Sequence, residues 1–425
     1  MKYLHLFLCL FLLSCQKEDV PLAVATKIDQ VYSEAKTILP TNPEKADQLA
    51  RSGFKLAKDN HYLKGEADGL FLLGGISSDQ GSYASAVKYY AQSLRIRQEL
   101  KDHQGLAKLY YSLGNAYQYC RLYTDAEQYF NTGLRISQQL PDKQMQATIE
   151  RALGLLYQQQ EEYEKAGKHY QKSLALFESL KSEYTAYLYN DLAVIKEMYP
   201  NPDYKAILSL YQKALLVSKQ KNSEIDIGLA LLNMGRMYVE LKDTSKALSY
   251  MRDSKNYFRR NAEYTTLALQ GEAEILLSMG RVQEAKNVFS EAEKLIPSLV
   301  GVQKQKGVEL YKFAQTLYAT NPDKLRSIKE KESALVNELK QVQQSIQIEQ
   351  LTEKDQLHQV KRDSLQQTIE RMEVAKNRFY WAIAVIITML VVAIWLFIKY
   401  YKLTHLFHEF IIARDPVLRH FDKPW

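Results

Sequence analysis

The feature that most constrains the fold is a motif that recurs every 40 residues. A Leu-Gly pair occurs at Leu73-Gly74, and the same pair returns at 113–114 and 153–154. An alanine follows each pair at one fixed distance, as Ala86, Ala126 and Ala166. Small residues at fixed positions let two helices cross closely, whereas leucine and tyrosine fill the space between helix pairs. The pattern therefore predicts one helical hairpin per repeat.

This motif resembles the tetratricopeptide repeat, in which Leu-Gly and then Tyr mark the first helix, and Ala and an aromatic residue mark the second. The residues that define the repeats are Leu73, Gly74, Ala86, Leu113, Gly114, Tyr117, Ala126, Leu153, Gly154, Tyr157 and Ala166. The resemblance implies an all-α solenoid. We expect six repeats over 63–300, a degenerate leading hairpin over 22–58 and a closing helix over 302–319.

A solenoid of this type curves, and the first helix of each repeat lines its groove. By resemblance, such a groove holds a peptide or protein partner. Seven residues of the first helices lie away from the packing positions and are candidates for this contact, although each is also compatible with solvated surface. They are Tyr111, Asn115, Gln118, Arg151, Gln158, Asn190 and Arg236. For any single one of them, solvated surface is the simpler interpretation.

Residues 323–378 contain neither Gly nor Pro and are rich in Lys, Glu, Gln and Leu. Leu335 and Leu339 begin one heptad seam, and Leu365, Ile369 and Met372 form another. The seams are out of register with each other. A charged helix of this length is poorly stable alone. It either pairs with a second copy of the chain or folds back on the solenoid; we expect a parallel homodimer.

Residues 379–398 are uncharged and apolar, with aromatic residues at both ends. Their length suits one bilayer core, and such aromatic belts are typical of membrane interfaces. We expect a transmembrane helix. Lysine and arginine are slightly more frequent before this segment than after it, which favours the opposite orientation to the one that an export signal implies. Long domains cross membranes largely regardless of charge, so we expect a periplasmic solenoid and a short cytoplasmic tail over 399–425.

The N-terminal apolar run is too short to span a bilayer as a helix and resembles a signal peptide over 1–14. Its end, LLSC at 12–15, resembles the lipobox of bacterial lipoproteins, which implies acylation of Cys15. A plain signal peptide that happens to contain Cys15 is the alternative. Together with the apolar segment 379–398, the signal predicts an inner-membrane protein that is single-pass and possesses a lipid anchor if Cys15 is acylated.

Nothing in the chain indicates an enzyme, a metal site, a cofactor or a nucleic-acid partner. A net charge of +7 is small for 425 residues. With only three cysteines, Cys9, Cys15 and Cys120, a disulfide framework is not expected. His405, His408 and Glu409 suit one helix face and a metal, but the tail offers no walled cavity, so an interfacial helix is the simpler interpretation.

The order of segments resembles that of Gram-negative envelope proteins with periplasmic tetratricopeptide repeats, a coiled coil, one membrane helix and a cytoplasmic output. No output domain is recognisable in this tail. Two functions are therefore expected from the sequence. One is a non-enzymatic, membrane-anchored scaffold that binds a peptide or protein. The other is a sensor that relays occupancy of the groove to a separate cytoplasmic partner.

Overall fold

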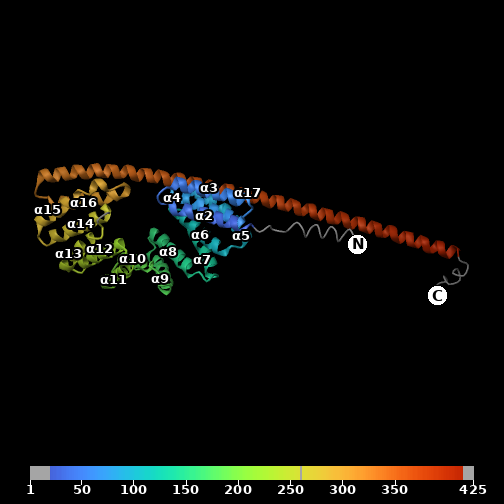
Figure 1. Cartoon of the computed structure of the whole chain (residues 1–425), viewed down its shortest axis with the longest axis horizontal. Helices are drawn as coiled ribbons and strands as arrows, with labels where there is room; N and C mark the ends of the chain where they lie inside the picture. The colour runs from blue at the N-terminus through green and yellow to red at the C-terminus, as the bar shows by residue number, and fades with distance from the viewer. Residues whose placement is uncertain (1–19, 259–260, 415–425) are drawn as a thin grey trace. The chain divides into compact units, whose positions relative to one another are not determined.

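The computed structural model describes residues 20–258 and 261–414, with side chains described as far as Phe407. Every regular element within those ranges is a helix, and successive helices pair into hairpins (Figure 1). The predicted signal peptide, Cys15 and the side chains of His408 and Glu409 lie outside the described residues. The helices are α2 (Leu22–Ile38), α3 (Pro43–Asp59), α4 (Leu63–Asp79), α5 (Tyr83–Leu100), α6 (His103–Tyr119), α7 (Tyr123–Gln138), α8 (Lys143–Gln159), α9 (Tyr163–Ser179), α10 (Thr185–Glu197), α11 (Tyr204–Gln220), α12 (Glu224–Glu240), α13 (Thr244–Lys255), α14 (Ala262–Ser278), α15 (Val282–Glu293), η2 (Ile296–Ser298), η3 (Gly301–Gln303), α16 (Lys304–Leu317) and α17 (Pro322–Arg414).

The Leu-Gly pairs lie where the two helices of a hairpin cross. A Cβ atom added to Gly74 would lie 2.3 Å from the ring of Tyr90, and one added to Gly154 would lie 2.5 Å from the ring of Tyr170. Gly114 makes the same approach to Phe130, at 2.4 Å. The leucines and alanines of the motif are buried around these rings. The all-α solenoid of paired helices that the repeats predict is confirmed.

The turns between helices follow one scheme. Aspartate side chains accept hydrogen bonds from the first turn of several helices; Asp102 and Asp142, for example, cap α6 and α8. Many helices end at a residue with positive φ, such as His61 after α3 and Lys101 after α5. Because these turns are short, helix after helix reverses direction at nearly equal spacing, which keeps the hairpins in register.

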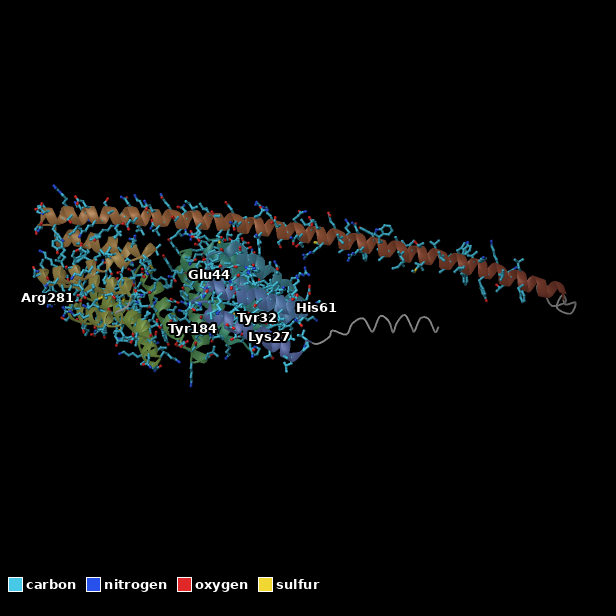
Figure 2. The ribbon with its side chains drawn as sticks, turned by 45° about the horizontal axis from the view of Figure 1, so that its top comes forward. Lys27, Tyr32, Glu44, His61, Tyr184 and Arg281 are labelled. Atoms are coloured by element: carbon cyan, nitrogen blue, oxygen red, sulfur yellow. The ribbon has the colours of Figure 1, made fainter. Side chains whose placement is uncertain are left out.

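The leading hairpin α2–α3 packs on the first repeat through Tyr32. This side chain lies within α2 (Figure 2), is buried, and donates a hydrogen bond from its hydroxyl to the carbonyl oxygen of Gly65 at 2.9 Å. A Cβ atom at Gly69 would lie 2.2 Å from the same hydroxyl. The first helix of the first repeat is therefore shaped to receive the tyrosine.

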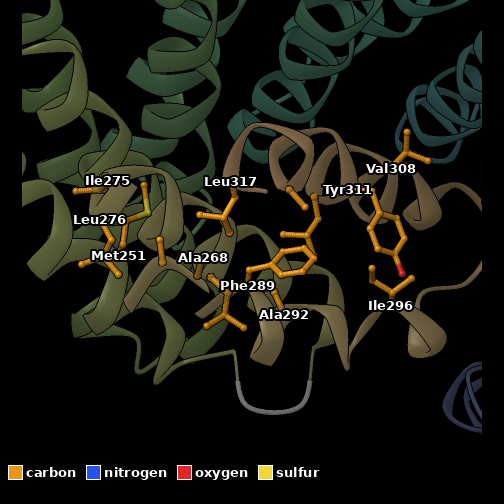
Figure 3. Close-up of a cluster of buried hydrophobic side chains, with 14 of the residues drawn as sticks. Met251, Ala268, Ile275, Leu276, Phe289, Ala292, Ile296, Val308, Tyr311 and Leu317 are labelled. Atoms are coloured by element: carbon orange, nitrogen blue, oxygen red, sulfur yellow. The ribbon is translucent and has the colours of Figure 1, made fainter. Parts of the chain in front are cut away.

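A second core closes the other end of the array. Phe289, Tyr311 and Leu317 belong to it, together with residues from α13 and α14 (Figure 3). The beginning of α17 is part of this cluster, because Ile328, Leu335 and Leu339 are buried in it. The heptad seam that Leu335 and Leu339 begin is therefore occupied within the chain. This corrects the expectation of a homodimer for the first seam of 323–378, which packs within the chain. Pairing of two copies through the second seam stays a prediction.

The chain separates into two units, 1–357 and 358–425, and α17 belongs to both. Within the second unit, Leu365, Ile369 and Met372 are exposed, so the second heptad seam has no partner within the described residues. By length and composition alone, α17 also holds one stretch that can cross a membrane, and none of that stretch is buried. The transmembrane segment over 379–398 stays a prediction.

Candidate binding groove

The first helices of successive repeats lie next to one another and form one continuous surface, which we call the A-helix face. It comprises the sides of α6, α8, α10, α12 and α14 that turn away from the second helices. The predicted groove residues all belong to these helices. Each helix contributes polar side chains to this face at similar positions, because the 40-residue period places equivalent residues side by side.

Hydrogen bonds join neighbouring first helices along this face. Gln118 donates to Gln159 at 3.1 Å, and the guanidinium of Arg151 donates to Asp191 at 3.0 Å. Asn190 accepts from the side-chain amide of Asn233 at 2.9 Å.

Arg236, from α12, donates to Glu197, from α10, at 3.1 Å. Four predicted groove residues thus form a polar ladder from one repeat to the next. Their contact with a ligand stays a prediction, since hydrogen bonds between neighbouring helices also occur on solvated surface.

The other predicted residues have local partners or lie between repeats. Gln158 accepts a hydrogen bond from the hydroxyl of Tyr170 at 2.6 Å, so a buried ring reaches the A-helix face with its polar end. The ring of Tyr111 lies against Phe130, with 6.1 Å between centroids. Asn115 is half-buried on α6. These three are mixed positions, partly packing and partly surface.

Asp191 is a largely enclosed charge of the ladder. Burial raises the pKa of its carboxyl above the ordinary value, whereas the adjacent Arg151 lowers it. Arg151 also lies over the ring of Tyr187, 5.9 Å from its centroid. The guanidinium is therefore held between a carboxylate and an aromatic face, which fixes its direction on the surface.

A cavity of about 630 Å³ is lined by residues of α12, α13, α14 and α16. Leu232, Met251 and Ile275 contribute its apolar walls. Charges of both signs line it as well, from Arg236, Lys306, Glu240 and Glu274. The side-chain carbonyl oxygen of Gln270 is buried and accepts no hydrogen bond. Gln270 lines the cavity, and a buried acceptor without a donor is costly, so a ligand N–H or O–H that reached this oxygen would be stabilised.

Sequence reasoning found Arg236 but missed the rest of this cavity. One signal was present: Gly271 lies within the first helix of the sixth repeat, where it costs helix stability. A Cβ atom there would lie 2.9 Å from Met251, so the glycine leaves room at the cavity wall. The residues that line the cavity come from four helices, and their convergence depends on how the repeats stack.

The described residues offer little for covalent chemistry. Among them, no group of three or more His, Cys, Asp or Glu side chains could hold a metal ion. Cys120 is a buried free thiol. Burial, together with the nearby Glu353, raises its pKa to about 12, so the thiolate that a nucleophile needs does not form near neutral pH.

A family model described as tetratricopeptide repeat matches residues 66–139 and 145–215. Both matched stretches therefore contain tetratricopeptide repeats. Comparison with curated proteins returned no match.

Solved structures share the fold at low sequence identity. The apo form of RapI aligns with a TM-score of 0.55 and 14% identity over 81% of this chain and 99% of its own. A signal transduction ATPase with a tetratricopeptide repeat sensor, from Pyrococcus horikoshii, gives a TM-score of 0.57 and 16% identity over 77% of this chain and 50% of its own. Aspartyl phosphate phosphatase F from Bacillus subtilis gives a TM-score of 0.51 and 17% identity over 78% of this chain and 86% of its own. These likenesses show the fold.

Proposed function

We propose that this tetratricopeptide-repeat protein is a membrane-anchored receptor for a peptide or an extended protein segment, which binds along the A-helix face. The observation that carries the proposal is the cavity lined by α12, α13, α14 and α16, because its lining residue Gln270 has a buried carbonyl oxygen without a hydrogen-bond partner. An extended peptide has what this site lacks: a backbone N–H for the buried acceptor, and a side chain for the apolar walls.

The polar ladder supports the same ligand class. Amide, guanidinium and carboxylate groups alternate along the first helices, and a peptide backbone presents donors and acceptors in alternation. A small apolar molecule would use the cavity but not the ladder. Tetratricopeptide folds are commonly scaffolds for protein partners, which agrees with this proposal. We propose a non-enzymatic role, although one fold neighbour is an aspartyl phosphate phosphatase.

The test is a selection of peptides from a displayed random library against the full chain in detergent micelles, followed by affinity measurement on the selected peptide. Gln270→Leu should weaken binding about tenfold or more, because it removes the acceptor that the ligand satisfies. It should not lower the free energy of unfolding, because it also removes a buried group without a partner. Gln283→Leu, on the exposed side of α15, is the matched control and should bind as the parent does. Equal affinity of both variants would contradict the assignment of the site.

We also propose that residues 379–398 cross the bacterial inner membrane, with the repeats in the periplasm and 399–425 in the cytoplasm. The exposed apolar stretch of α17 supports this, since such a surface is stable only when it is covered by lipid or protein. Alkaline phosphatase fused after residue 378 should be active, and fused after residue 402 it should be inactive. Metabolic labelling with palmitate tests Cys15; label that persists on the Cys15→Ala protein would refute acylation there.

A signalling role is the second candidate. One helix, α17, includes both the residues that pack on the repeats and the apolar stretch, so a displacement at the repeats has a continuous path along it. Deleting 403–425 separates the candidates. A scaffold keeps its function without the tail, whereas a sensor that relays to a cytoplasmic partner loses the response.

A further inference from the structure

The beginning of α17 contacts both ends of the repeat array. We call residues 322–357, which belong to the same unit as the repeats, the strap. Its first half is deeply anchored: Leu335 and Leu339 are buried in the closing core, and Lys331 pairs with Glu293 at 2.7 Å. A Cβ atom on Gly307 of α16 would lie 2.7 Å from Leu335, so the two helices are in close contact there.

The last part of the strap returns to the first two repeats. The carboxylate of Glu353 accepts a hydrogen bond from the backbone N–H of Ala84, at the start of α5, at 2.8 Å. This is a charge-assisted contact at the positive end of a helix dipole. Leu357 is fully buried, whereas Leu351, earlier in the same helix, is 54% exposed. Glu349 lies beside Gly81 in the turn before α5.

The two attachments differ in strength. The anchored half places Ile328, Leu335 and Leu339 in a large apolar cluster, whereas the docked end has one buried leucine and one capping carboxylate. Since buried apolar area provides most of the stability of such contacts, the docked end is the one that opens first. It lies directly before residue 358, where the second unit begins.

The candidate cavity lies close to the contact between α16 and the anchored half. Lys306 lines the cavity, and the next residue, Gly307, is the position that accommodates Leu335 of the strap. The polar ladder is equally relevant, because it sets the angle between neighbouring repeats and hence the distance between the ends of the array. A ligand that replaces ladder bonds or enters the cavity changes the geometry that the strap must span.

We propose that residues 349–357 form a latch whose docking on the first two repeats is coupled to the geometry of the A-helix face, so that occupancy of the groove and docking of the latch regulate each other. The link to occupancy rests on the proposed function; the link between ladder and latch does not. Because coupling between two sites is reciprocal, a loosened latch changes ligand affinity by the factor by which the ligand changes latch opening.

Cys120 is a built-in reporter of the latch, because this buried thiol lies near Glu353. Labelling of the full chain in detergent micelles with N-ethylmaleimide at pH 8, read at Cys120 by peptide mass spectrometry, measures how often the latch opens. The parent protein should label slowly. Leu357→Ser should label about tenfold faster or more, Glu353→Gln should be intermediate, and Leu351→Ser should label as the parent does, because Leu351 is already exposed.

The coupling itself is tested in the ladder. The double variant Asn233→Ala, Arg236→Ala breaks the bonds from α12 to α10, far along the chain from Cys120, and should raise the labelling rate at Cys120 about threefold or more. Gln283→Ala, with no ladder contact, should leave it unchanged. Circular dichroism shows whether each variant is folded. If Leu357→Ser does not fold, Glu353→Gln is the variant that tests the latch.

Fast labelling of the parent would refute the latch. Faster labelling in Leu357→Ser, together with no change in the ladder variant, would refute the coupling. If peptide selection yields no ligand while the ladder variant raises the labelling rate at Cys120, the proposed function is rejected and the latch is retained.

Discussion

Gly74 and Gly75 are adjacent in α4, yet replacing them by alanine should have opposite effects on stability. A Cβ atom on Gly74 would lie 2.3 Å from Cε1 and 2.5 Å from Cδ1 of Tyr90. A Cβ atom on Gly75 would have no other atom within 4 Å. The pair therefore tests whether the glycine of the Leu-Gly motif is required by packing or merely tolerated.

The magnitude follows from the ring that must move. Tyr90 is 3% exposed, and ordinary contact requires its ring to retreat by about 1 Å within a close-packed core. Overpacking of this kind costs about 1–3 kcal/mol, whereas alanine in place of glycine gains about 0.5–1 kcal/mol of helix stability. Gly74→Ala should thus lower the free energy of unfolding by about 1–2 kcal/mol, and Gly75→Ala should raise it by up to about 1 kcal/mol.

Urea unfolding of the full chain in detergent micelles, followed by circular dichroism, measures the difference. Because repeat arrays can unfold segment by segment, hydrogen exchange in α4 and α5 should accompany it. The protection of α5 should fall in Gly74→Ala and rise or stay constant in Gly75→Ala. Equal stabilisation by both substitutions would show that Tyr90 moves aside freely and that the motif does not depend on this crossing.

Three further outcomes are expected. Arg97 is buried between two carboxylates. Arg97→Met should lower the free energy of unfolding, measured from urea midpoints, by about 3 kcal/mol. This is near the lower limit for breaking a buried ion pair, because both acids are partly exposed. Burial raises the pKa of Tyr90 from 10.0 to about 12, so the folded state holds the hydroxyl proton more tightly than the unfolded state does. The stability that this provides is complete below pH 10 and is lost as the pH rises from 10 to 12. Tyr90→Phe should therefore flatten the decline in urea midpoint over that range. For the exposed heptad seam, Ile369→Cys should form a disulfide-linked dimer in membranes and Arg371→Cys, on the opposite face, should not; monomers from both would refute pairing of two chains there.

The hairpins could be predicted because their determinants are local. Leucine, glycine and alanine recur with one period, and this recurrence identifies the helix faces that meet, whatever the curvature of the array. The partners of Arg151 and Arg236 could not be predicted, because Asp191 and Glu197 belong to a neighbouring repeat and reach them only at one angle between repeats. The cavity was harder still to predict, since residues of four helices line it.

The strap shows a different limit of sequence reasoning. Leu335 and Leu339 follow a heptad, and a heptad predicts a helical partner without saying whether that partner is another chain or the same one. Leu357 lies outside the seam, so periodicity gave no reason to expect its burial. The contact of Glu353 joins residues 269 positions apart, and such a contact depends on the path of the whole array.

The fixed length of the strap also restricts the number of repeats. Between Ile328 and Leu357 the helix rises about 44 Å, a length that no loop can adjust. Solenoids commonly gain or lose units by duplication and deletion, because each unit contacts only its neighbours. Here an added or deleted hairpin would move one end of the array away from its place on the helix. Variation in repeat number should therefore be selected against in chains that keep this helix, and should return in those that have lost Leu357 and Glu353.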